Sequence, residues 1–426
     1  MDMPVARPVI LQVLPALDAG GIEQGTIDMA QAITQAGGVA LAACAGGRML
    51  PRLTYGGGIH VPLDLRAKNP VSILLNARRL AREIRARGVH LVHARSRAPG
   101  WSAALACRMT GVPLVTTWHG VYRENIPGKR RYNAVMASGR RVIAISAFIA
   151  RRLTRDYRVG PDRLRVIPRG ADTARFDPAT VRGPRIQALA DQWGLPEGAA
   201  IIMLPGRLTR WKGQALLLDA LTRLEAQSGG EGDGGDRPWV CVFVGPGRRR
   251  DRFGDSLKQM AQAHPALRGR VFFAGHCADM PAALAMADVV VVPSLEPEPF
   301  GRVVVEAQAM GRPVVVAAHG AAMETVADGQ TGLLVPPGDP DALAAAIGTL
   351  LRLTLDEAMA LGATARAHVL AHYTTEAMQQ ATLAVYDEIL GSSLADWFAW
   401  QNAQPAGDTF QDPAPLQEAI LHTDVQ

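Results

Sequence analysis

The sequence predicts an α/β protein with two parallel, doubly wound sheets in tandem. Its 426 residues exceed what one ordinary hydrophobic core holds, so two domains are expected. Short apolar runs alternate with helical stretches along the chain, which is the pattern of parallel α/β sheets. The alternation is broken near 175–198, around "DTARFDPATVRGP", and we place the domain boundary there.

The first series of strands is read from apolar runs such as "VILQVL" and "VHLVH", each followed by a polar or glycine-containing turn. Helical periodicity fills the intervals. The expected strands are 9–14, 39–43, 89–93, 113–117, 141–145 and 164–167, with helices at 23–36 and 70–87 among them.

A second series of the same kind begins with "AIIMLP" and predicts the second sheet. After a last helix that ends near Leu390, the sequence becomes polar and weakly periodic, which predicts a tail with little regular structure. The expected strands are 200–205, 239–244, 271–274, 288–292, 313–317 and 332–335, with helices at 213–226, 255–263, 280–287 and 301–311.

Nothing in the sequence predicts secretion or a membrane span. No stretch approaches the ~18 uncharged apolar residues that cross a bilayer. The opening "PVILQVLPALDAGG" lacks a small-residue cleavage site, so we interpret it as a first strand. The four cysteines are scattered without a C-x-x-C pair, which favours reduced thiols in the cytoplasm.

The net charge of +6 is unevenly distributed. From Arg78 to Arg169 there are 21 basic and four acidic residues, whereas the chain beyond Arg169 has more acidic than basic residues. This asymmetry predicts an anionic partner for the N-terminal half: nucleic acid, an acidic substrate or an anionic membrane surface. A solvated arginine-rich surface without a partner is the alternative.

The stretch "LDAGGIEQGTIDMA" places two glycines between the first strand and the first helix. Gly20 and Gly21 allow the backbone to approach a ligand closely, and the helix start offers N–H groups to an anion. The spacing is not G-x-G-x-x-G, so a dinucleotide site is not indicated. A purely structural βα turn is the alternative.

A second βα turn, "PGRLTRWKGQ", follows the first strand of the second series. Arg207 and Lys212 flank the turn. An arginine fork and a lysine point charge suit a diphosphate, although two solvated charges at a helix start would give the same sequence.

His119, in "TTWHGVYRE", comes directly after an expected strand. Ligands of open α/β sheets bind at the carboxyl ends of the strands, so His119 is a candidate contact to a reacting group. A structural histidine is the alternative.

In "EPFGRVVVE", Glu298 and Glu306 enclose the expected start of a helix near Phe300–Gly301. The N–H groups from Gly301 to Val304 should face an incoming anion, with the helix dipole favouring negative charge. The two carboxylates can border one ligand but are poorly placed to chelate one ion, so no metal is expected. A nucleotide diphosphate fits this arrangement.

Taken together, "LPALDAGGIEQ", "VIAISAFI", "VIPRGADTARFDP", "PGRLTRWKG" and "EPFGRVVVEAQAMGRPVVV" resemble the family 4 retaining glycosyltransferases of GT-B fold. The segments "ARSRAPGWSA" and "RRYNAVMASG" are similar to those of mannosyl- or glucosyltransferases of lipopolysaccharide-core assembly in alphaproteobacteria. The sequence departs from the family at Gly320 and Ala321, where many members have two glycines, while Glu324 is retained. We expect only a local change in that loop.

The resemblance implies two Rossmann-like, doubly wound domains facing a cleft. The expected parts are an acceptor-binding domain (1–186), a nucleotide-sugar-binding domain (187–375), a helix packing back toward the first domain (376–395) and a polar tail (396–426).

The resemblance also implies roles for the candidate residues. Arg207 and Lys212 would neutralise the diphosphate, and Glu306 would take the ribose hydroxyls. Glu298 would take a sugar hydroxyl, and His119 would contact the sugar near the reacting carbon. The groups that would close over or hold the phosphate and the sugar are Gly20 and Gly21 in the first domain, and Phe300 with the amides of Gly301, Arg302, Val303 and Val304 in the second.

The expected activity is metal-independent hexose transfer, with retained configuration, from a nucleotide sugar to a lipid-linked saccharide in lipopolysaccharide core or exopolysaccharide synthesis. The donor would be GDP-mannose, favoured, or UDP-glucose; no cofactor is expected. The enzyme would be cytoplasmic and bound peripherally to the inner membrane through its basic N-terminal domain. The alternatives are a nucleotide-sugar epimerase or hydrolase of the same fold and, from another class, a nucleic-acid-binding protein.

Overall fold

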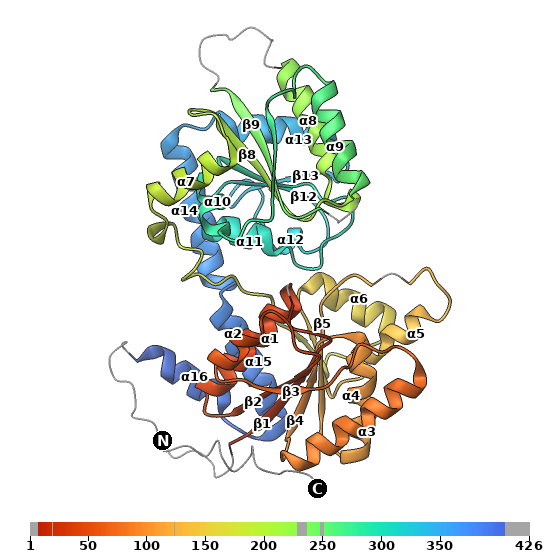
Figure 1. Ribbon diagram of the computed structural model, residues 1–426. Coiled ribbons are helices and arrows are strands. Elements are labelled where there is room, and N and C mark those ends of the chain that lie inside the picture. Colours follow the sequence, from red (N-terminus) through yellow and green to blue (C-terminus); the bar gives the residue numbers. More distant parts are fainter. Residues whose placement is uncertain (1–6, 19, 123, 228–236, 248–250, 405–426) are drawn as a thin grey trace. The chain divides into compact units, whose positions relative to one another are not determined.

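The computed structural model describes the chain except residues 1–6, 19, 123, 228–236, 248–250 and 405–426. Its contacts divide the chain into two units, each a sheet covered by helices (Figure 1). The first unit comprises Met1–Ile145, Ile149–Ile167 and Met378–Gln426, and the second comprises Ser146–Phe148 and Pro168–Ala377.

The first unit contains a parallel sheet that, within the described residues, has seven strands in the order β3-β2-β1-β4-β5-β6-β7. The first strand pairs on one side with β2 and on the other with β4, so the strand order reverses between β1 and β4. In such sheets, ligands bind at the carboxyl ends of the strands beside this reversal. The strands are β1 (Val9–Val13), β2 (Val39–Cys44), β3 (Ile59–Pro62), β4 (Leu91–Ala94), β5 (Leu114–Trp118), β6 (Arg141–Ala144) and β7 (Leu164–Val166).

Helices cover both faces of this sheet, because neighbouring residues of a strand point to opposite faces. Ile10 packs in a core with α1, α15 and α16. The next residue, Leu11, packs in a second core with α3 and α4. The helices are α1 (Gly21–Gln35), α2 (Leu50–Tyr55), α3 (Pro70–Ala86), α4 (Arg97–Thr110), α5 (Lys129–Asn133), α6 (Ala147–Tyr157), α15 (Thr375–Leu390) and α16 (Leu394–Ala403).

Helix α3 shows how the sequence sets a helix start. Asn69 accepts a hydrogen bond from the N–H of Ser72 at 2.8 Å, and Pro70 occupies the first helical position. An asparagine cap followed by proline satisfies an unpaired donor and fixes the backbone angle that the first turn needs.

The second unit repeats the architecture. In the part of it that the structure describes, six parallel strands follow the order β10-β9-β8-β11-β12-β13. Strands β8 and β11 pair at its reversal point. The strands are β8 (Ala200–Pro205), β9 (Trp239–Val244), β10 (Val271–Gly275), β11 (Val289–Val292), β12 (Val314–Ala317) and β13 (Leu333–Val335).

Helices α8 and α13 pack on the core side formed by Ile202, Phe243 and Val289. A 3-10 turn, η3 (Arg210–Lys212), precedes α8. The helices are α7 (Gly183–Trp193), α8 (Gln214–Gln227), α9 (Arg252–Ala263), α10 (Met280–Met286), α11 (Arg302–Ala309), α12 (Ala322–Thr325), α13 (Pro340–Leu351) and α14 (Leu355–His372).

The predicted α/β architecture of two parallel, doubly wound sheets is confirmed, with three differences of detail. The short strand β3 was not predicted, and α16 forms inside the predicted polar tail. Helix α16 exists because Leu394 and Phe398, one helical turn apart, enter the core below α1. Residues 405–426 of that tail lie outside the described residues.

The third difference concerns the domain boundary, which the sequence placed after residue 186. Pro168 and the residues after it belong to the second unit. Ala171 forms a parallel bridge with Thr374, and Asp177 forms an ion pair with Arg366 at 3.1 Å. These contacts with the end of α14 bind the segment before α7 to the second unit.

Candidate active site

Lys212 and Glu298 meet at the carboxyl ends of β8 and β11. Lys212 is the last residue of η3, and its Nζ lies 2.7 Å from Oε1 of Glu298. Both side chains are largely buried, with 14% and 15% of their surface exposed, respectively. The ammonium also lies 4.5 Å from the centre of the Trp211 ring. The two candidate residues therefore form one partly buried ion pair.

A glycine makes this approach possible. Gly213 has φ +78°, and a Cβ on it would run into the backbone oxygen of Pro293, next to the end of β11. Because only a glycine allows this closeness, the start of α8 can lie against the end of β11.

Glu298 has a second partner, which sequence reasoning missed. Ser294 Oγ donates to Oε1 of Glu298 at 2.5 Å, and His319 Nε2 lies 2.7 Å from the backbone oxygen of Ser294. Together with Glu298, Phe300 and Gly301, these two residues line a hollow of about 10 Å³. Each lies two residues beyond the end of a strand, so the rule that singled out His119 could have found them.

The loop around Gly320 packs against the backbone of Glu298. Gly320 has φ +64°, and a Cβ there would collide with the backbone of Glu298. The next residue, Ala321, has right-handed helical angles, and its N–H donates to the oxygen of Glu298 at 3.0 Å. An alanine therefore fits here without strain, although many family members have a glycine.

Helix α11 begins at Arg302, and Glu306 lies one turn into it. Arg302 Nη2 donates to Oε1 of Glu306 at 2.7 Å, and Glu306 is 9% exposed. Glu298 lies before the helix rather than on it. The second glutamate of the predicted pair, like the first, is thus matched with a cation of its own unit.

The predicted row of amides at the start of α11 needs one correction. The N–H of Val304 donates to the oxygen of Gly301 at 3.0 Å, so it is used within the turn. For the N–H groups of Gly301, Arg302 and Val303, the described residues provide no acceptor. Three amides, rather than four, remain for a ligand; Phe300 itself is buried and packs edge-on against Tyr373.

Arg207 lies in the turn after β8 and is exposed. Its backbone oxygen accepts a hydrogen bond from the side chain of Gln214 at 3.0 Å, which fixes the turn. Within the residues that the structure describes, its guanidinium has no acidic partner. Arg207 and Arg210 are thus two exposed cations in the turn that leads to Lys212.

The remaining candidates belong to the first unit. Gly20 caps α1, Gly21 is the first residue of that helix, and His119 directly follows β5. All three lie at the carboxyl end of the first sheet, as the sequence predicted. The structure thus brings Lys212, Glu298 and the start of α11 together in one unit and places these three residues in the other.

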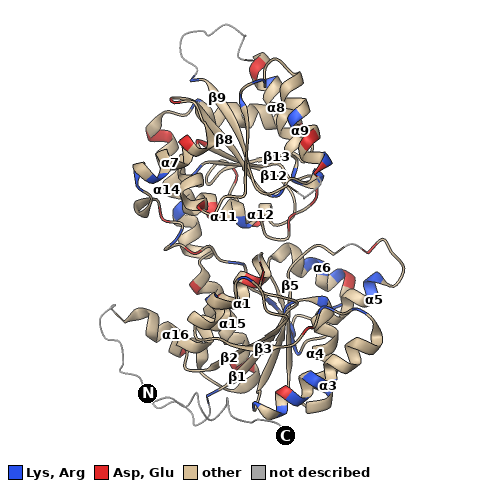
Figure 2. Cartoon of the chain, viewed as in Figure 1, with Lys and Arg blue, Asp and Glu red and all other residues tan. Residues whose placement is uncertain are grey.

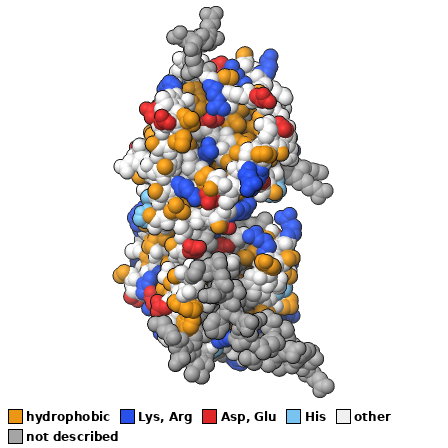
Figure 3. Space-filling view, turned by 90° about the vertical axis from the view of Figure 1, so that its left-hand side faces the viewer, with side chains coloured by type: hydrophobic (Ala, Val, Ile, Leu, Met, Phe, Trp, Pro, Cys, Tyr) orange, Lys and Arg blue, Asp and Glu red, His pale blue; other side chains and the backbone are white. Residues whose placement is uncertain are grey.

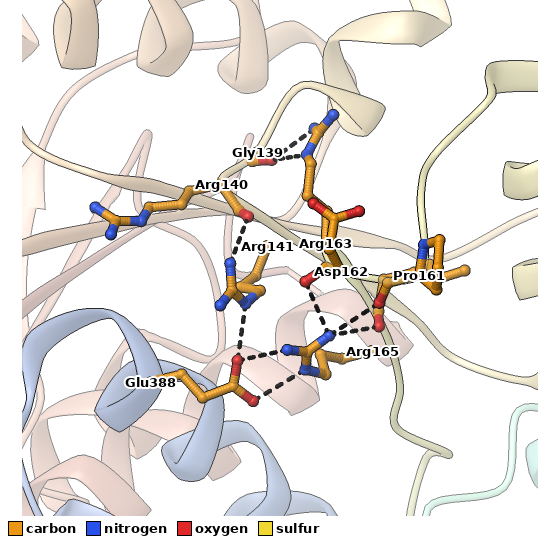
Figure 4. Close-up of polar contacts among 9 residues, drawn as sticks. Gly139, Arg140, Arg141, Pro161, Asp162, Arg163, Arg165 and Glu388 are labelled. Atoms are coloured by element: carbon orange, nitrogen blue, oxygen red, sulfur yellow. Dashed lines mark hydrogen bonds and ion pairs between the residues drawn. The ribbon is translucent and has the colours of Figure 1, made fainter.

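Part of the predicted basic surface has a structural function. Glu388 on α15 accepts hydrogen bonds from Arg165 at 2.9 and 2.8 Å and from Arg141 at 2.8 Å (Figure 4). Arg163 donates to the backbone oxygens of Ala137 and Gly139. Exposed cations remain along α3, α5 and α6 (Figure 2). On the face of the second unit seen in Figure 3, basic and acidic side chains are interspersed.

No set of three or more His, Cys, Asp or Glu side chains in the described part of the chain is arranged to hold a metal ion. Of the helices that the structure describes, none combines the length and the hydrophobicity that a membrane span requires. The candidate site itself offers cations, carboxylates and backbone amides.

Two family models match the chain. Residues 19–175 match a model described as "Glycosyltransferase Family 4", and residues 186–368 match one described as "Glycosyl transferases group 1". A D-inositol 3-phosphate glycosyltransferase of Acidothermus cellulolyticus is 31% identical over 344 residues, which cover 75% of this chain and 73% of the relative.

Solved structures give the same result. A glycosyltransferase from Rickettsia africae superimposes with a TM-score of 0.82 at 33% identity, covering 91% of this chain and all of the other. Anabaena HepE, solved in complex with UDP and glucose, superimposes with a TM-score of 0.76 at 25% identity, covering 89% of this chain and all of that one.

Proposed function

The chain belongs to the group 1 glycosyltransferases and has their GT-B fold, and on that premise we propose that it transfers a hexose from a nucleotide sugar to a lipid-linked saccharide. We propose further that transfer retains the anomeric configuration and needs no metal ion. The observation that carries the proposal is the Lys212–Glu298 pair beside the start of α11.

The proposed mechanism follows from where charge develops. Cleavage of the sugar–phosphate bond places negative charge on the leaving diphosphate and positive charge on the sugar ring. Lys212, Arg207 and the first amides of α11 would stabilise the diphosphate without a metal. Attack on the same face of the sugar, assisted by the leaving phosphate, would retain the configuration without a protein nucleophile.

The ion pairs suggest how the donor enters. In the structure, Lys212 neutralises Glu298 and Arg302 neutralises Glu306. A diphosphate would draw the ammonium of Lys212 to itself, and Glu298 would then accept a hydrogen bond from a sugar hydroxyl. Oε2 of Glu306, which Arg302 leaves open, would take the ribose. Donor binding would exchange one set of charged partners for another.

Two donors are candidates. The N-terminal segments of the sequence favour mannose and hence GDP-mannose, whereas HepE binds UDP and glucose. Release of nucleotide from a panel of nucleotide sugars, measured with and without acceptor, tests the proposal. Release of UDP or GDP that depends on Lys212 supports a transferase; release of free sugar that no acceptor stimulates would favour a hydrolase.

We propose that the enzyme works at an anionic membrane surface. Four exposed side chains of α3 form a stripe at helical spacing: the apolar Val71 and Leu75 come first, and Arg78 and Arg82 follow. Val71 and Leu75 are 69% and 46% exposed. Apolar residues beside arginines suit the headgroup region of an anionic bilayer. Lipopolysaccharide-core or exopolysaccharide intermediates in such a membrane are the proposed acceptors.

Co-sedimentation with phosphatidylglycerol vesicles at low salt tests the membrane proposal. We expect binding that weakens as salt increases and that the double variant Arg78→Glu/Arg82→Glu loses. Arg268→Glu, an exposed position of the second unit, is the matched control. Failure of the wild-type chain to bind would refute this part of the proposal.

A further inference from the structure

The first unit contains a cavity of about 590 Å³ at the carboxyl end of its sheet. Its walls are formed by loops and helix starts that follow β3, β4 and β5. It lies beside the point between β1 and β4 where the strand order reverses. The residues that matter for its chemistry are Arg66, Lys68, Ser96, Arg97, Lys129 and Tyr132. Lys68 lies in the loop before α3, and Lys129 is the first residue of α5.

Four of the lining side chains are cations, and none of the lining residues that the structure describes is acidic. Arg66 is matched by Asp64, just outside the lining, at 2.7 Å, and this pair is exposed to solvent. For Lys68 and Lys129, the described residues offer no carboxylate. The cavity therefore carries a net positive charge that an anion could neutralise.

Neutral partners hold Arg97 in place. Its Nη1 donates to Oδ1 of Asn133 at 2.9 Å, and its guanidinium lies 3.9 Å from the centre of the Tyr122 ring. An amide oxygen and an aromatic face position the group without neutralising its charge. Arg97 is thus oriented in advance and remains available to an anion.

The start of α4 adds donors on the same wall. Ser96 caps this helix of 14 residues, but its hydroxyl makes no capping hydrogen bond. In the described structure, the N–H groups of Arg97 and Ala98 in the first turn also have no acceptor. Helix starts attract phosphate through such amides and through the helix dipole.

The cavity is larger than a phosphate alone and falls in the size range of sites for small organic ligands. Tyr132 provides a flat wall: its ring lies near that of Trp101, whose Nε1 donates to the backbone oxygen of Tyr132. Lys129 Nζ lies 5.8 Å from the same ring. An aromatic wall beside several cations suits a sugar or polyol ring that carries a phosphate.

We propose that this cavity binds a phosphate ester on the acceptor, so that the enzyme selects acceptors in which a hydroxylated ring carries a phosphate. The proposal rests on the proposed function, because it assigns the cavity to the acceptor of the same reaction. The phosphate could belong to a free sugar phosphate or to a phosphorylated glycolipid, which present the same chemistry to Lys68, Arg97 and Lys129.

Calorimetry on the full chain without donor tests the site, with glucose 6-phosphate, glucose and inorganic phosphate as probes. We expect glucose 6-phosphate to bind at least about tenfold more tightly than glucose, as a charge-assisted contact implies. In Lys68→Ala/Lys129→Ala the affinity should fall about tenfold for each cation removed. Arg131→Ala, an exposed arginine of α5 outside the lining, should leave it unchanged.

Equal binding of glucose and glucose 6-phosphate would overturn the proposal, as would an equal loss in Arg131→Ala. Unchanged UDP or GDP binding in the double variant would show that it is folded. The wild-type chain could bind glucose 6-phosphate through the two lysines and yet bind no nucleotide. That result would contradict the proposed function and would still support an anion site in the cavity.

Turnover distinguishes the two sources of phosphate. Transfer to the soluble hexose phosphate would assign a free acceptor. Transfer only to a phosphorylated glycolipid in phosphatidylcholine vesicles would assign a membrane acceptor. If the enzyme bound glucose 6-phosphate but transferred to neither acceptor, the assignment of the cavity to the acceptor would be overturned.

Discussion

The two units share one architecture but match their cations with different kinds of partner. In the second unit, Lys212 pairs with Glu298 and Arg302 with Glu306, inside the candidate site itself. In the first unit, neutral groups hold Arg97 beside the cavity, whereas the carboxylate of Glu388 binds arginines elsewhere in the unit.

The comparison distinguishes cations placed to bind a ligand, such as Lys212 and Arg97, from the arginines that Glu388 holds to stabilise the fold. A ligand of the second unit has to compete with an internal carboxylate, so it must offer both anionic and hydroxyl groups. An anion entering the first cavity displaces no carboxylate from Arg97. In the first unit, by contrast, Glu388 and Tyr386 connect α15 to side chains of the sheet.

The largest effect is expected for Lys212→Ala. Loss of the ammonium that faces the diphosphate should reduce kcat roughly 100- to 1,000-fold, as removal of a preorganised electrostatic donor does in other enzymes. The fold should persist, although the melting temperature should fall because the largely buried Glu298 loses its ion-pair partner. Arg210→Ala, an exposed neighbour in η3, is the control for turnover. Near-normal turnover of Lys212→Ala would contradict the assignment of the phosphate site.

Glu306→Ala should weaken nucleotide binding rather than slow chemistry. Loss of a charged acceptor for the ribose should raise the Kd for UDP or GDP roughly 10- to 100-fold. Because the ribose contact exists before and during the reaction, kcat should change less than KM. Arg302→Ala should give a smaller increase in Kd, and Asp255→Ala, exposed on α9, should give none.

A third variant tests the buried polar network of the first unit. Tyr386 OH lies 2.7 Å from Nδ1 of His93, whose Nε2 lies 2.6 Å from Oγ1 of Thr117. Burial holds the pKa of His93 well below its ordinary value and raises the pKa of Tyr386 to about 12, so both are neutral.

Tyr386→Phe leaves one ring nitrogen of His93 buried without its partner, which should lower the free energy of unfolding by about 1–3 kcal/mol. Urea denaturation measures it, with Tyr55→Phe, at a fully exposed tyrosine, as control. Nucleotide affinity should stay the same. If Tyr386→Phe lost nucleotide binding but not stability, the buried network of the first unit would serve the ligand site of the second unit rather than the fold.

Glu388→Gln tests the exposed counterpart of that network. Hydrogen bonds from Arg165, and then from Arg141, hold the pKa of the Glu388 carboxyl below its ordinary value. The stabilisation is therefore present above the pKa of the unfolded chain and is lost as the pH falls through the folded one.

We expect Glu388→Gln to be about 1 kcal/mol less stable than wild type at pH 7, with the difference vanishing as the pH falls through the folded pKa of Glu388. Urea unfolding across this pH range measures it. Asp396→Asn, exposed on α16, should follow the wild-type profile. A difference that persists at low pH would assign the effect to packing instead of charge.

The smallest expected effect is that of chelation. If Lys212, Arg207 and the amides of α11 stabilise the diphosphate, then EDTA should leave turnover unchanged. Initial rates with EDTA and with added Mg²⁺ measure this. Strict dependence on a divalent ion would contradict the site proposed for the second unit.

Much of the fold follows from local pattern, whereas its exceptions follow from tertiary contacts. Strands such as Ala200–Pro205 are apolar runs bounded by turns, so their position is read directly. Strand β3 is only "IHVP", too short and too mixed to stand out. Helix α16 becomes regular because α1 covers its apolar side, which no property of the local sequence shows.

The sequence predicted which residues belong to the candidate site, but it did not predict which of them form ion pairs with one another. Lys212 and Glu298 were found because they lie beside helix starts that follow strands, where cations and backbone amides suit a diphosphate. Their ion pair joins residues 86 positions apart, and Glu388 meets Arg141 across 247 positions. Only the folded chain shows which cations these carboxylates neutralise: Lys212 for Glu298, and Arg141 with Arg165 for Glu388.

The path of the chain has a consequence for how the protein is made. The first unit receives its final core residues, including Leu383 and Tyr386, from a segment that follows the whole second unit. On the ribosome, the second unit can close as soon as residue 377 has emerged, while the first sheet still lacks the helix that covers one of its faces. N-terminal domains usually fold first during synthesis. Here the first unit would be completed only after the second unit has folded.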